Sequence, residues 1–176
     1  MNEFKADLEA IRKRAISKMD DGAVPEGYRG DVEKVIAVLQ EVLATETVCV
    51  LRYKRHYYAA KGIHGKSVEE EFLQHASEEQ VHADRVARRI DELGGAPDLN
   101  PDTLTKRSHA EYGKATELKE MIKEDLVAER IAVETYLAII KWLGETDPTT
   151  RRMIEEILEQ EEEHADDMAK LLERVG

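Results

Sequence analysis

The feature that most limits how this chain can fold is a duplicated pattern of charged residues within apolar helical stripes. Apolar residues that recur every three or four positions indicate an amphipathic helix. Two such stretches each contain a Glu-x-x-His motif, and the stretch before each contains a single glutamate. That glutamate precedes the motif by 33 residues in the first half and by 32 in the second. The pattern predicts two similar helical hairpins. The residues are Glu46, Glu79 and His82 in the first half, and Glu129, Glu161 and His164 in the second.

The apolar spacing predicts four long helices, over about residues 31–61, 67–93, 116–143 and 148–175. Residues 96–113 form a long connection between the second and third helices, with one helical turn near Leu104. A connection of this length can cross from one end of a four-helix bundle to the other. We therefore expect an all-α fold, with a four-helix bundle over residues 31–176 and an N-terminal helix and loop over residues 1–30.

Capping and turn residues mark the expected helix ends. Asp31 is the predicted N-cap of the first long helix, and Gly62 is its predicted end. Asp147 followed by Pro148 is a strong start signal for the last helix. Residues 3–19 are predicted to form a shorter amphipathic helix.

Composition and charge exclude several classes of protein. Charged residues make up 36% of the chain and aromatic residues 5%, a balance typical of long amphipathic helices. The formal net charge of −12 argues against DNA binding, because DNA binding needs a basic surface. The same charge suits a protein that attracts cations. Cys49 is the single cysteine, so an internal disulfide is excluded. No apolar run reaches the ~20 residues of a membrane span, and the N-terminus does not read as a signal peptide. We therefore expect a cytoplasmic protein.

The two Glu-x-x-His motifs favour a site for two metal ions. Residues three positions apart project from the same face of a helix, so one motif presents a carboxylate and an imidazole together. Two antiparallel motif helices, with one glutamate from each of two further helices, supply the ligand set of di-iron and di-manganese bundles. Carboxylate oxygens bind both Fe(II) and Fe(III), and neutral imidazole adds affinity without adding charge.

The motif alone is weak, because two matches arise readily by chance in a chain so rich in glutamate. The stronger signal is that carboxylates interrupt apolar stripes. An unpaired buried carboxylate costs several kcal/mol or takes up a proton, and no lysine or arginine lies on the same stripes. A metal-free interaction bundle is the non-enzymatic alternative.

These residues carry a resemblance to the ferritin-like superfamily, and within it to the bacterioferritin branch, over about residues 31–175. The segment Glu79-Gln-Val-His82-Ala-Asp-Arg85 is similar to the second-helix signature of that branch. Asp125-Leu-Val-Ala-Glu129 and Glu161-Glu-Glu-His164 resemble its third and fourth helices. The resemblance implies that Glu79 and Glu161 bridge two iron ions, that Glu46 and Glu129 are terminal carboxylates, and that His82 and His164 are terminal nitrogen ligands.

The resemblance also implies roles for residues beside the ligands. Tyr53 matches a tyrosine that bacterioferritins keep near the di-iron site, a candidate one-electron donor. Asp125 matches a carboxylate that would orient His82. Gln80 stands where haem-binding bacterioferritins have a methionine, so haem is not expected.

Two residues one helical turn from predicted ligands have other interpretations. Cys49, near Glu46, is interpreted as a small buried hydrophobe. The cysteine pair that some relatives carry near the metals is absent or incomplete here, because Cys49 is the single cysteine. His75, near Glu79, is interpreted as a hydrogen-bonded core or interface histidine rather than a ligand on the way into the site.

The ends of the chain resemble a different branch. Bacterioferritins continue into a short fifth helix, whereas this chain has an extra N-terminal helix, an outline similar to the Dps family of twelve-subunit cages. Ordinary Dps proteins bind iron between subunits. The resemblance is therefore to the Dps-like group with a bacterioferritin-like di-iron centre inside each subunit, and it implies a homo-oligomeric cage of twelve rather than twenty-four subunits.

The function implied is ferroxidation with iron storage. Such a protein oxidises Fe(II) to Fe(III) with H2O2 or O2, deposits ferric mineral in the cage and protects the cell against oxidative stress. Manganese or zinc are the expected substitutes for iron. The alternative is a non-storing di-iron or di-manganese peroxidase or catalase, similar to rubrerythrin or manganese catalase. The absence of a Cys-x-x-Cys module disfavours the rubrerythrin type.

Overall fold

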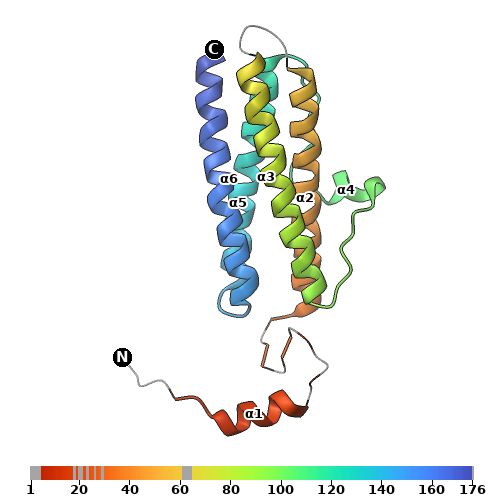
Figure 1. Cartoon of the computed structure of the whole chain (residues 1–176), viewed down its shortest axis with the longest axis vertical. Helices are drawn as coiled ribbons and strands as arrows, with labels where there is room; N and C mark the ends of the chain where they lie inside the picture. The colour runs from red at the N-terminus through yellow and green to blue at the C-terminus, as the bar shows by residue number, and fades with distance from the viewer. Residues whose placement is uncertain are drawn as a thin grey trace.

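The computed structural model describes residues 5–17, 19, 22, 24–25, 27–28, 30–60 and 65–175, apart from the side chains of residues 65 and 67. Every regular element in these ranges is a helix (Figure 1). The all-α prediction is therefore confirmed. The helices are α1 (Leu8–Ser17), α2 (Val32–Ala59), α3 (Gly65–Glu92), α4 (Pro101–Arg107), α5 (Leu118–Leu143) and α6 (Pro148–Val175).

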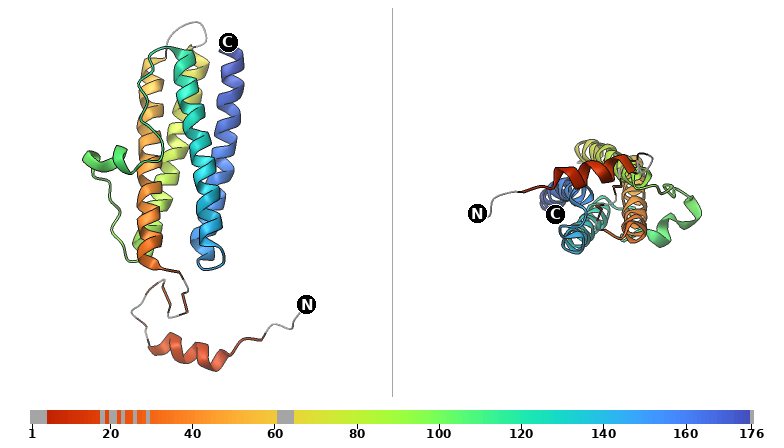
Figure 2. Two further views of the ribbon diagram at one scale, coloured as in Figure 1. Left: turned by 180° about the vertical axis from the view of Figure 1, so that it is seen from behind. Right: turned by 90° about the horizontal axis from the view of Figure 1, so that it is seen from below.

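The four long helices form two antiparallel hairpins, α2 with α3 and α5 with α6, packed into one bundle (Figure 1). Residues 93–117 cross from the end of α3 to the opposite end of the bundle, where α5 begins (Figure 2). The predicted helical turn in this crossover is α4, which packs against α2 through Leu104. The crossover makes α3 and α6 antiparallel neighbours, so the two motif helices face each other.

The ends of the long helices follow the capping signals. Asp31 accepts a hydrogen bond from the backbone N–H of Lys34 at 3.2 Å, as expected of an N-cap. Asp147 Oδ1 accepts one from the N–H of Thr150 at 2.9 Å, at the start of α6. Helix α3 begins at Gly65, two residues before its predicted start. The predicted end of α2 at Gly62 lies outside the described residues.

The bundle core has two apolar clusters separated by a polar layer. One cluster contains residues from the first half of α2 and α6 and from the second half of α3 and α5, among them the fully buried Leu39, Ile90 and Ile154. The other contains the opposite halves, with Phe72 and Met168 among its buried residues. The two clusters bury the apolar stripes above and below the polar layer, which fixes the layer at mid-height in the bundle.

Helix α1 lies across one end of the bundle (Figure 2). Its predicted apolar stripe is not buried: Leu8 is 58% exposed and Ile11 is 43% exposed. Tyr28, between α1 and α2, donates a hydrogen bond from its hydroxyl to Asp147 Oδ2 at 2.8 Å. None of the helices in the described part of the chain is both long and apolar enough to cross a membrane.

Candidate metal centre

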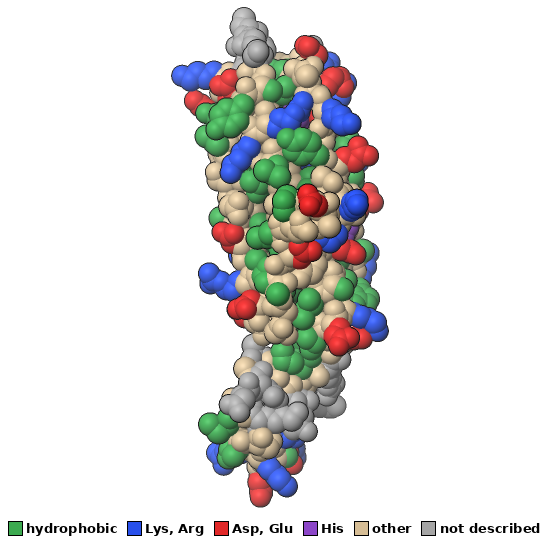
Figure 3. Space-filling view, turned by 90° about the vertical axis from the view of Figure 1, so that its right-hand side faces the viewer, with side chains coloured by type: hydrophobic (Ala, Val, Ile, Leu, Met, Phe, Trp, Pro, Cys, Tyr) green, Lys and Arg blue, Asp and Glu red, His purple; other side chains and the backbone are tan. Residues whose placement is uncertain are grey.

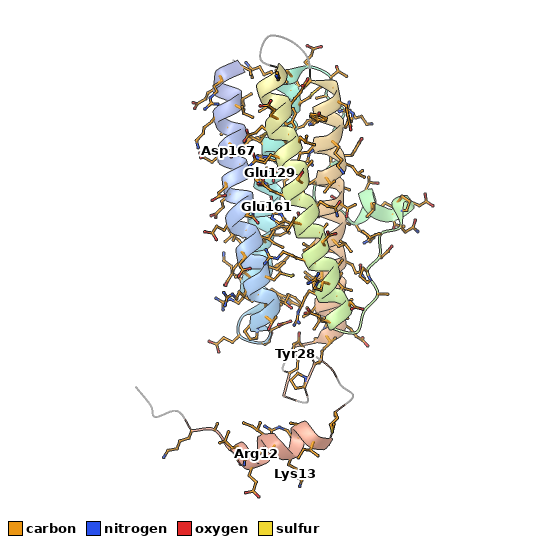
Figure 4. All side chains as sticks on the ribbon, in the orientation of Figure 1. Arg12, Lys13, Tyr28, Glu129, Glu161 and Asp167 are labelled. Atoms are coloured by element: carbon orange, nitrogen blue, oxygen red, sulfur yellow. The ribbon has the colours of Figure 1, made fainter. Side chains whose placement is uncertain are left out.

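The polar layer draws residues from all four long helices. Each is at most 3% exposed. Figure 4 shows Glu129 and Glu161 at mid-height in the bundle. The structure thus brings together all six residues that the duplicated sequence pattern predicted as ligands. They are Glu46 on α2, Glu79 and His82 on α3, Glu129 on α5, and Glu161 and His164 on α6.

Two overlapping groups of potential ligand atoms occur in this layer, and within each group the atoms lie within 4.8 Å of one another. Glu79 and Glu161 belong to both groups. Four-helix bundles with two bridged ions have this arrangement, because the shared carboxylates bridge the ions. The first group adds Glu46 and His82, and the second adds Glu129 and His164.

The imidazole Nδ1 atoms face the carboxylates at short range. His82 Nδ1 lies 3.0 Å from Glu161 Oε1 and 3.4 Å from Glu79 Oε2. His164 Nδ1 lies 3.3 Å from Glu79 Oε1 and 3.7 Å from Glu161 Oε2. The Nδ1 atom of each histidine therefore lies close to both shared glutamates, and the two histidines face different oxygens of each.

All six residues have at least one buried polar side-chain atom without a hydrogen-bond partner among the described residues. Buried polar atoms are normally hydrogen-bonded, and an unsatisfied group costs about 1–3 kcal/mol. Carboxylate oxygens and imidazole nitrogens that converge without hydrogen-bond partners fit metal ligation, because each can offer a lone pair once the protons of the layer are displaced. The donor set suits iron or manganese. The atoms are Glu46 Oε2, both Oε atoms of Glu79, His82 Nδ1, Glu129 Oε2, Glu161 Oε1 and His164 Nδ1.

Burial makes the terminal carboxyl groups reluctant to ionise in the polypeptide alone. Burial, followed by the charges of Glu161 and Glu79, raises the pKa of Glu46 well above its usual value. Burial and the same two neighbours also raise the pKa of Glu129 well above its usual value. These two residues therefore tend to hold protons when nothing else neutralises the layer.

The two histidines titrate in the opposite sense from ordinary buried histidines. Burial by itself would lower the pKa of His164, but its contacts with Glu161 and Glu79 raise it to about 11. Burial by itself would also lower the pKa of His82, but contacts with carboxylates, that of Glu161 above all, raise it well above its usual value. A cation that binds in this layer must displace these protons, so binding is coupled to proton release.

Two tyrosines hold the terminal glutamates from opposite hairpins. Tyr53 Oη, on α2, donates a hydrogen bond to Glu129 Oε1 at 2.6 Å. Tyr136 Oη, on α5, donates one to Glu46 Oε1. In both glutamates the other oxygen, Oε2, is the one without a hydrogen-bond partner. Each tyrosine therefore leaves one carboxylate oxygen directed at the centre of the layer.

The outer nitrogen of each histidine is bound by the residue that immediately precedes the opposite motif. His82 Nε2 lies 2.9 Å from Gln160 Oε1, and His164 Nε2 lies 2.9 Å from Glu78 Oε2. Sequence reasoning missed both partners, although their position directly before each motif glutamate was a usable signal. One histidine therefore has an amide partner and the other a carboxylate partner, which makes the two halves chemically unequal.

The predicted role of Asp125 as the partner that orients His82 is wrong. Asp125 Oδ1 accepts a hydrogen bond from Arg52 Nε at 2.8 Å, and its Oδ2 lies 2.8 Å from His56 Nδ1. Asp125 is on α5 beside α2, whereas His82 meets the α6 residue Gln160. The prediction failed because it did not anticipate the fully buried Arg52, which takes the carboxylate instead.

Arg52 is also the basic residue that the apolar stripes were expected to lack. Its Nη2 lies 3.7 Å from Glu129 Oε1 and donates a hydrogen bond to Cys49 Sγ at 3.3 Å. Its Nη1 donates to the carbonyl of Glu111 in the crossover at 3.1 Å. Cys49 is buried as predicted. Arg52 thus ties the outer edge of the polar layer to the crossover.

A family model described as a ferritin-like domain matches residues 36–175. A bacterioferritin from Desulfovibrio desulfuricans is 30% identical over 132 residues, which cover 74% of this chain and 70% of that protein. A DNA protection during starvation protein from Pyrococcus furiosus is 30% identical over 139 residues, 76% of this chain and 74% of that protein.

Among solved structures, the dodecameric thioferritin of Bacteroides fragilis, a bacterioferritin-related protein, is similar to this chain. The two chains are 30% identical and superpose with a TM-score of 0.79, over 84% of this chain and 89% of the other. The likeness covers the bundle and its fold, and it agrees with the resemblance found from the motifs.

Proposed function

Because this chain belongs to the family of ferritin-like domains, we propose that it oxidises Fe(II) at a paired metal centre within each subunit and stores the ferric product in a cage. Hydrogen peroxide or dioxygen is the oxidant, so the protein removes the reactants of oxidative damage. Fe(II) is the substrate, and manganese or zinc can take its place at the ligands. The proposal assigns the six residues of the polar layer as the iron ligands.

The observation that carries the proposal is the set of unpartnered buried atoms. The residues that share the two ligand groups, Glu79 and Glu161, fit the bridging position between two ions. Glu46 and His82 would then complete the ligand set of one ion, and Glu129 and His164 would complete that of the other. A structural bundle without a metal has no reason to leave these atoms unsatisfied, since apolar residues of similar size stabilise a core better than unpaired charges.

The chain's own residues would perform three tasks in the reaction. The carboxylates hold iron in either oxidation state, because hard oxygen ligands accept both. Tyr53 and Tyr136 orient Glu129 and Glu46, so that both carboxyl groups are already positioned when iron arrives. Two Fe(II) ions each lose one electron, and one hydrogen peroxide takes both electrons with two protons to give two waters. Tyr53, hydrogen-bonded to a ligand at 2.6 Å, is the proposed one-electron donor when a single iron is present.

Assembly into a homo-oligomeric cage, twelve subunits rather than twenty-four, is part of the proposal. The similar Bacteroides protein is a dodecamer. Figure 3 shows hydrophobic side chains among the charged ones along the face of the bundle that carries α4. Exposed apolar residues of α5, among them Val127 and Ile131, offer surface for subunit contacts. DNA is left out, because the net charge of −12 opposes it, and haem is left out, because Gln80 offers no thioether.

The test is to add excess Fe(II) and H2O2 to the purified protein, then measure oxidation rate, oligomer size and retained iron per chain. We expect a large particle that retains far more than two irons per chain. Glu129→Ala and His164→Ala should abolish rapid oxidation. Glu163→Gln is the matched control, since Glu163 is exposed beside His164 and outside both ligand groups.

Three other results would contradict the proposal in different ways. A small oligomer that retains two irons or fewer rejects storage. Peroxide consumption to dioxygen without retained iron favours the catalase-like alternative. Wild-type protein that behaves like Glu129→Ala in all three measurements leaves only the metal-free bundle.

A further inference from the structure

A second cluster of ligand atoms lies on the His164 side of the paired centre. Glu71 and His75 on α3 and Asp167 on α6 each place one ligand atom within 4.8 Å of the others. His75 Nε2 lies 3.6 Å from Glu71 Oε1 and 3.9 Å from Asp167 Oδ2. Ligand atoms bonded to one divalent ion at ~2.1 Å lie about 3–4 Å apart. The three atoms are therefore spaced to share one cation.

The hydrogen bonds of Tyr53 determine which nitrogen of His75 is free to bind. The single hydroxyl hydrogen of Tyr53 goes to Glu129, so toward His75 Nδ1, 3.2 Å away, the same oxygen accepts. The proton of a neutral His75 is therefore on Nδ1, and Nε2 has a lone pair.

That lone pair is directed at two acceptors rather than at a donor. His75 is 1% exposed, and its Nε2 makes no hydrogen bond to any described residue. Carboxylate oxygens of Glu71 and Asp167 lie 3.6 and 3.9 Å from it, and when ionised they also have only lone pairs to offer. A shared cation stabilises three acceptors that face one another.

The cluster extends from the surface toward the paired centre. The side chains of Asp167 and Glu71 are 41% and 32% exposed, whereas that of His75 is 1% exposed. The ring of His75 stacks on that of His164 with the centroids 4.1 Å apart. Figure 4 shows Asp167 farther along the bundle than Glu129 and Glu161, toward the C-terminal end of α6. The cluster therefore lies between solvent and the His164 half of the centre.

The duplication of the hairpins supplies an internal comparison. His75 lies four residues before Glu79, and the residue four before Glu161 is Ile157. Asp167 lies six residues after Glu161, and the residue six after Glu79 is Arg85.

The position of Glu71, eight residues before Glu79, corresponds to Met153, eight before Glu161. The other side of the centre thus has Ile157, Arg85 and Met153 at the positions where this side has three residues able to bind a cation. The cluster is consequently a one-sided feature and does not follow from the repeat.

We propose that Glu71, His75 and Asp167 form a third, weaker site for a divalent cation, from which Fe(II) passes to the paired centre. The identity of the cation as Fe(II) rests on the proposed function, whereas the site itself rests on the geometry above. Lys170 Nζ lies 3.7 Å from the other oxygen of Asp167 and is exposed, so it competes with the cation and keeps the site weak. Weak binding suits a site that must release its ion inward.

Cobalt(II) is the probe, because it binds the same donors as Fe(II) and is not oxidised by air under these conditions. The full-length assembled protein is titrated with Co(II), and crystals soaked in Co(II) are examined for anomalous density. We expect three ions per chain, two tight and one weaker, with the weaker ion next to His75 Nε2.

The variant is Glu71→Gln with Asp167→Asn, which keeps the shape of both side chains. The matched control is Glu70→Gln with Glu173→Gln, which removes the same number of charges at exposed positions on the same helices. The variant should lose the weak ion and keep the two tight ones, and the control should keep all three. At limiting iron, the variant should oxidise Fe(II) about tenfold more slowly, because the local cation concentration falls.

Each result decides between the two proposals. Two ions at the paired centre with none at His75 reject the third site alone, as does a weak ion that survives in the variant or is lost in the control. An ion at His75 with none at the paired centre rejects the proposed function and leaves the third site standing.

Discussion

Tyr53 on α2 holds Glu129 on α5 through a 2.6 Å hydrogen bond, across the boundary between the two hairpins. Tyr136 on α5 makes the reciprocal bond to Glu46 on α2. Each hairpin therefore orients a proposed ligand of the other. A change in Tyr53 should therefore weaken the ion bound by Glu129, and a change in Tyr136 should weaken the ion bound by Glu46.

Replacement of Tyr53 by phenylalanine tests this relationship. Tyr53→Phe leaves Glu129 Oε1 without its donor, which should weaken cation binding by about tenfold, as changes in residues that orient ligands do. It should also slow iron oxidation. Co(II) titration and stopped-flow oxidation measure the two effects. Tyr58→Phe is the control, since Tyr58 is 80% exposed. Equal behaviour of the two variants would contradict the role given to Tyr53.

The unequal partners of the two histidines predict unequal ions. Glu78 accepts from His164 as a carboxylate, whereas Gln160 accepts from His82 as an amide. A carboxylate that accepts from the outer N–H makes the imidazole a more basic metal ligand than an amide does. The ion bound by His164 should therefore be held more tightly than the ion bound by His82.

Exchange of these partners should change the affinities in opposite directions. Gln160→Glu should tighten the ion at His82, and Glu78→Gln should loosen the ion at His164, each by about tenfold. Stepwise Co(II) titration resolves the two affinities. If both steps stay unchanged in both variants, the outer hydrogen bonds do not tune the centre.

Arg52 is predicted to be essential for stability. It is fully buried and bonds Asp125 at 2.8 Å. Arg52→Met leaves Asp125 as a buried charge with only His56 beside it, which should destabilise the fold by about 3–5 kcal/mol. Urea unfolding measures the loss. Arg88→Met, at an exposed position of α3, should change stability by less than about 0.5 kcal/mol.

A double variant separates the lost ion pair from lost packing. Arg52→Met combined with Asp125→Leu removes both charges and should recover much of the stability, since an apolar pair tolerates burial. If the double variant is as unstable as the sum of its parts, the guanidinium acts mainly through its contact with the crossover at Glu111.

The metal-free protein should lose stability as the pH rises above about 6.5. The folded-state pKa of His164 is raised from 6.5 to about 11. The group therefore binds its proton more tightly when folded, and its stabilisation is complete below pH 6.5 and declines as the pH approaches 11. The raised pKa values of Glu46 and Glu129 act in the same direction.

Bound cations should reverse this trend, because they replace the protons of the layer and compete better as the pH rises. Melting temperatures measured between about pH 6 and pH 9, with chelator and with Co(II), test both halves of the prediction. A metal-free melting curve that does not move with pH would show that the histidines are not protonated in the folded layer.

The sequence by itself determined the helices and the residues of the centre. Apolar spacing depends only on the order of residues along one chain, so it located α2, α3, α5 and α6 to within a few residues. The Glu-x-x-His spacing placed Glu79 with His82 on one face of a helix, because residues three positions apart always share a helical face. The division into an N-terminal part before residue 31 and a bundle after it stays a prediction.

Only the tertiary structure decided which residues meet across helices. The partners of the outer imidazole nitrogens, Gln160 and Glu78, come from the opposite motif helix. Asp125 pairs with Arg52 rather than with His82. Such contacts depend on the register and separation of neighbouring helices and on side-chain rotamers, none of which is encoded in the periodicity of a single helix. For the same reason the outer cluster at His75 is visible only when α3 and α6 are placed side by side.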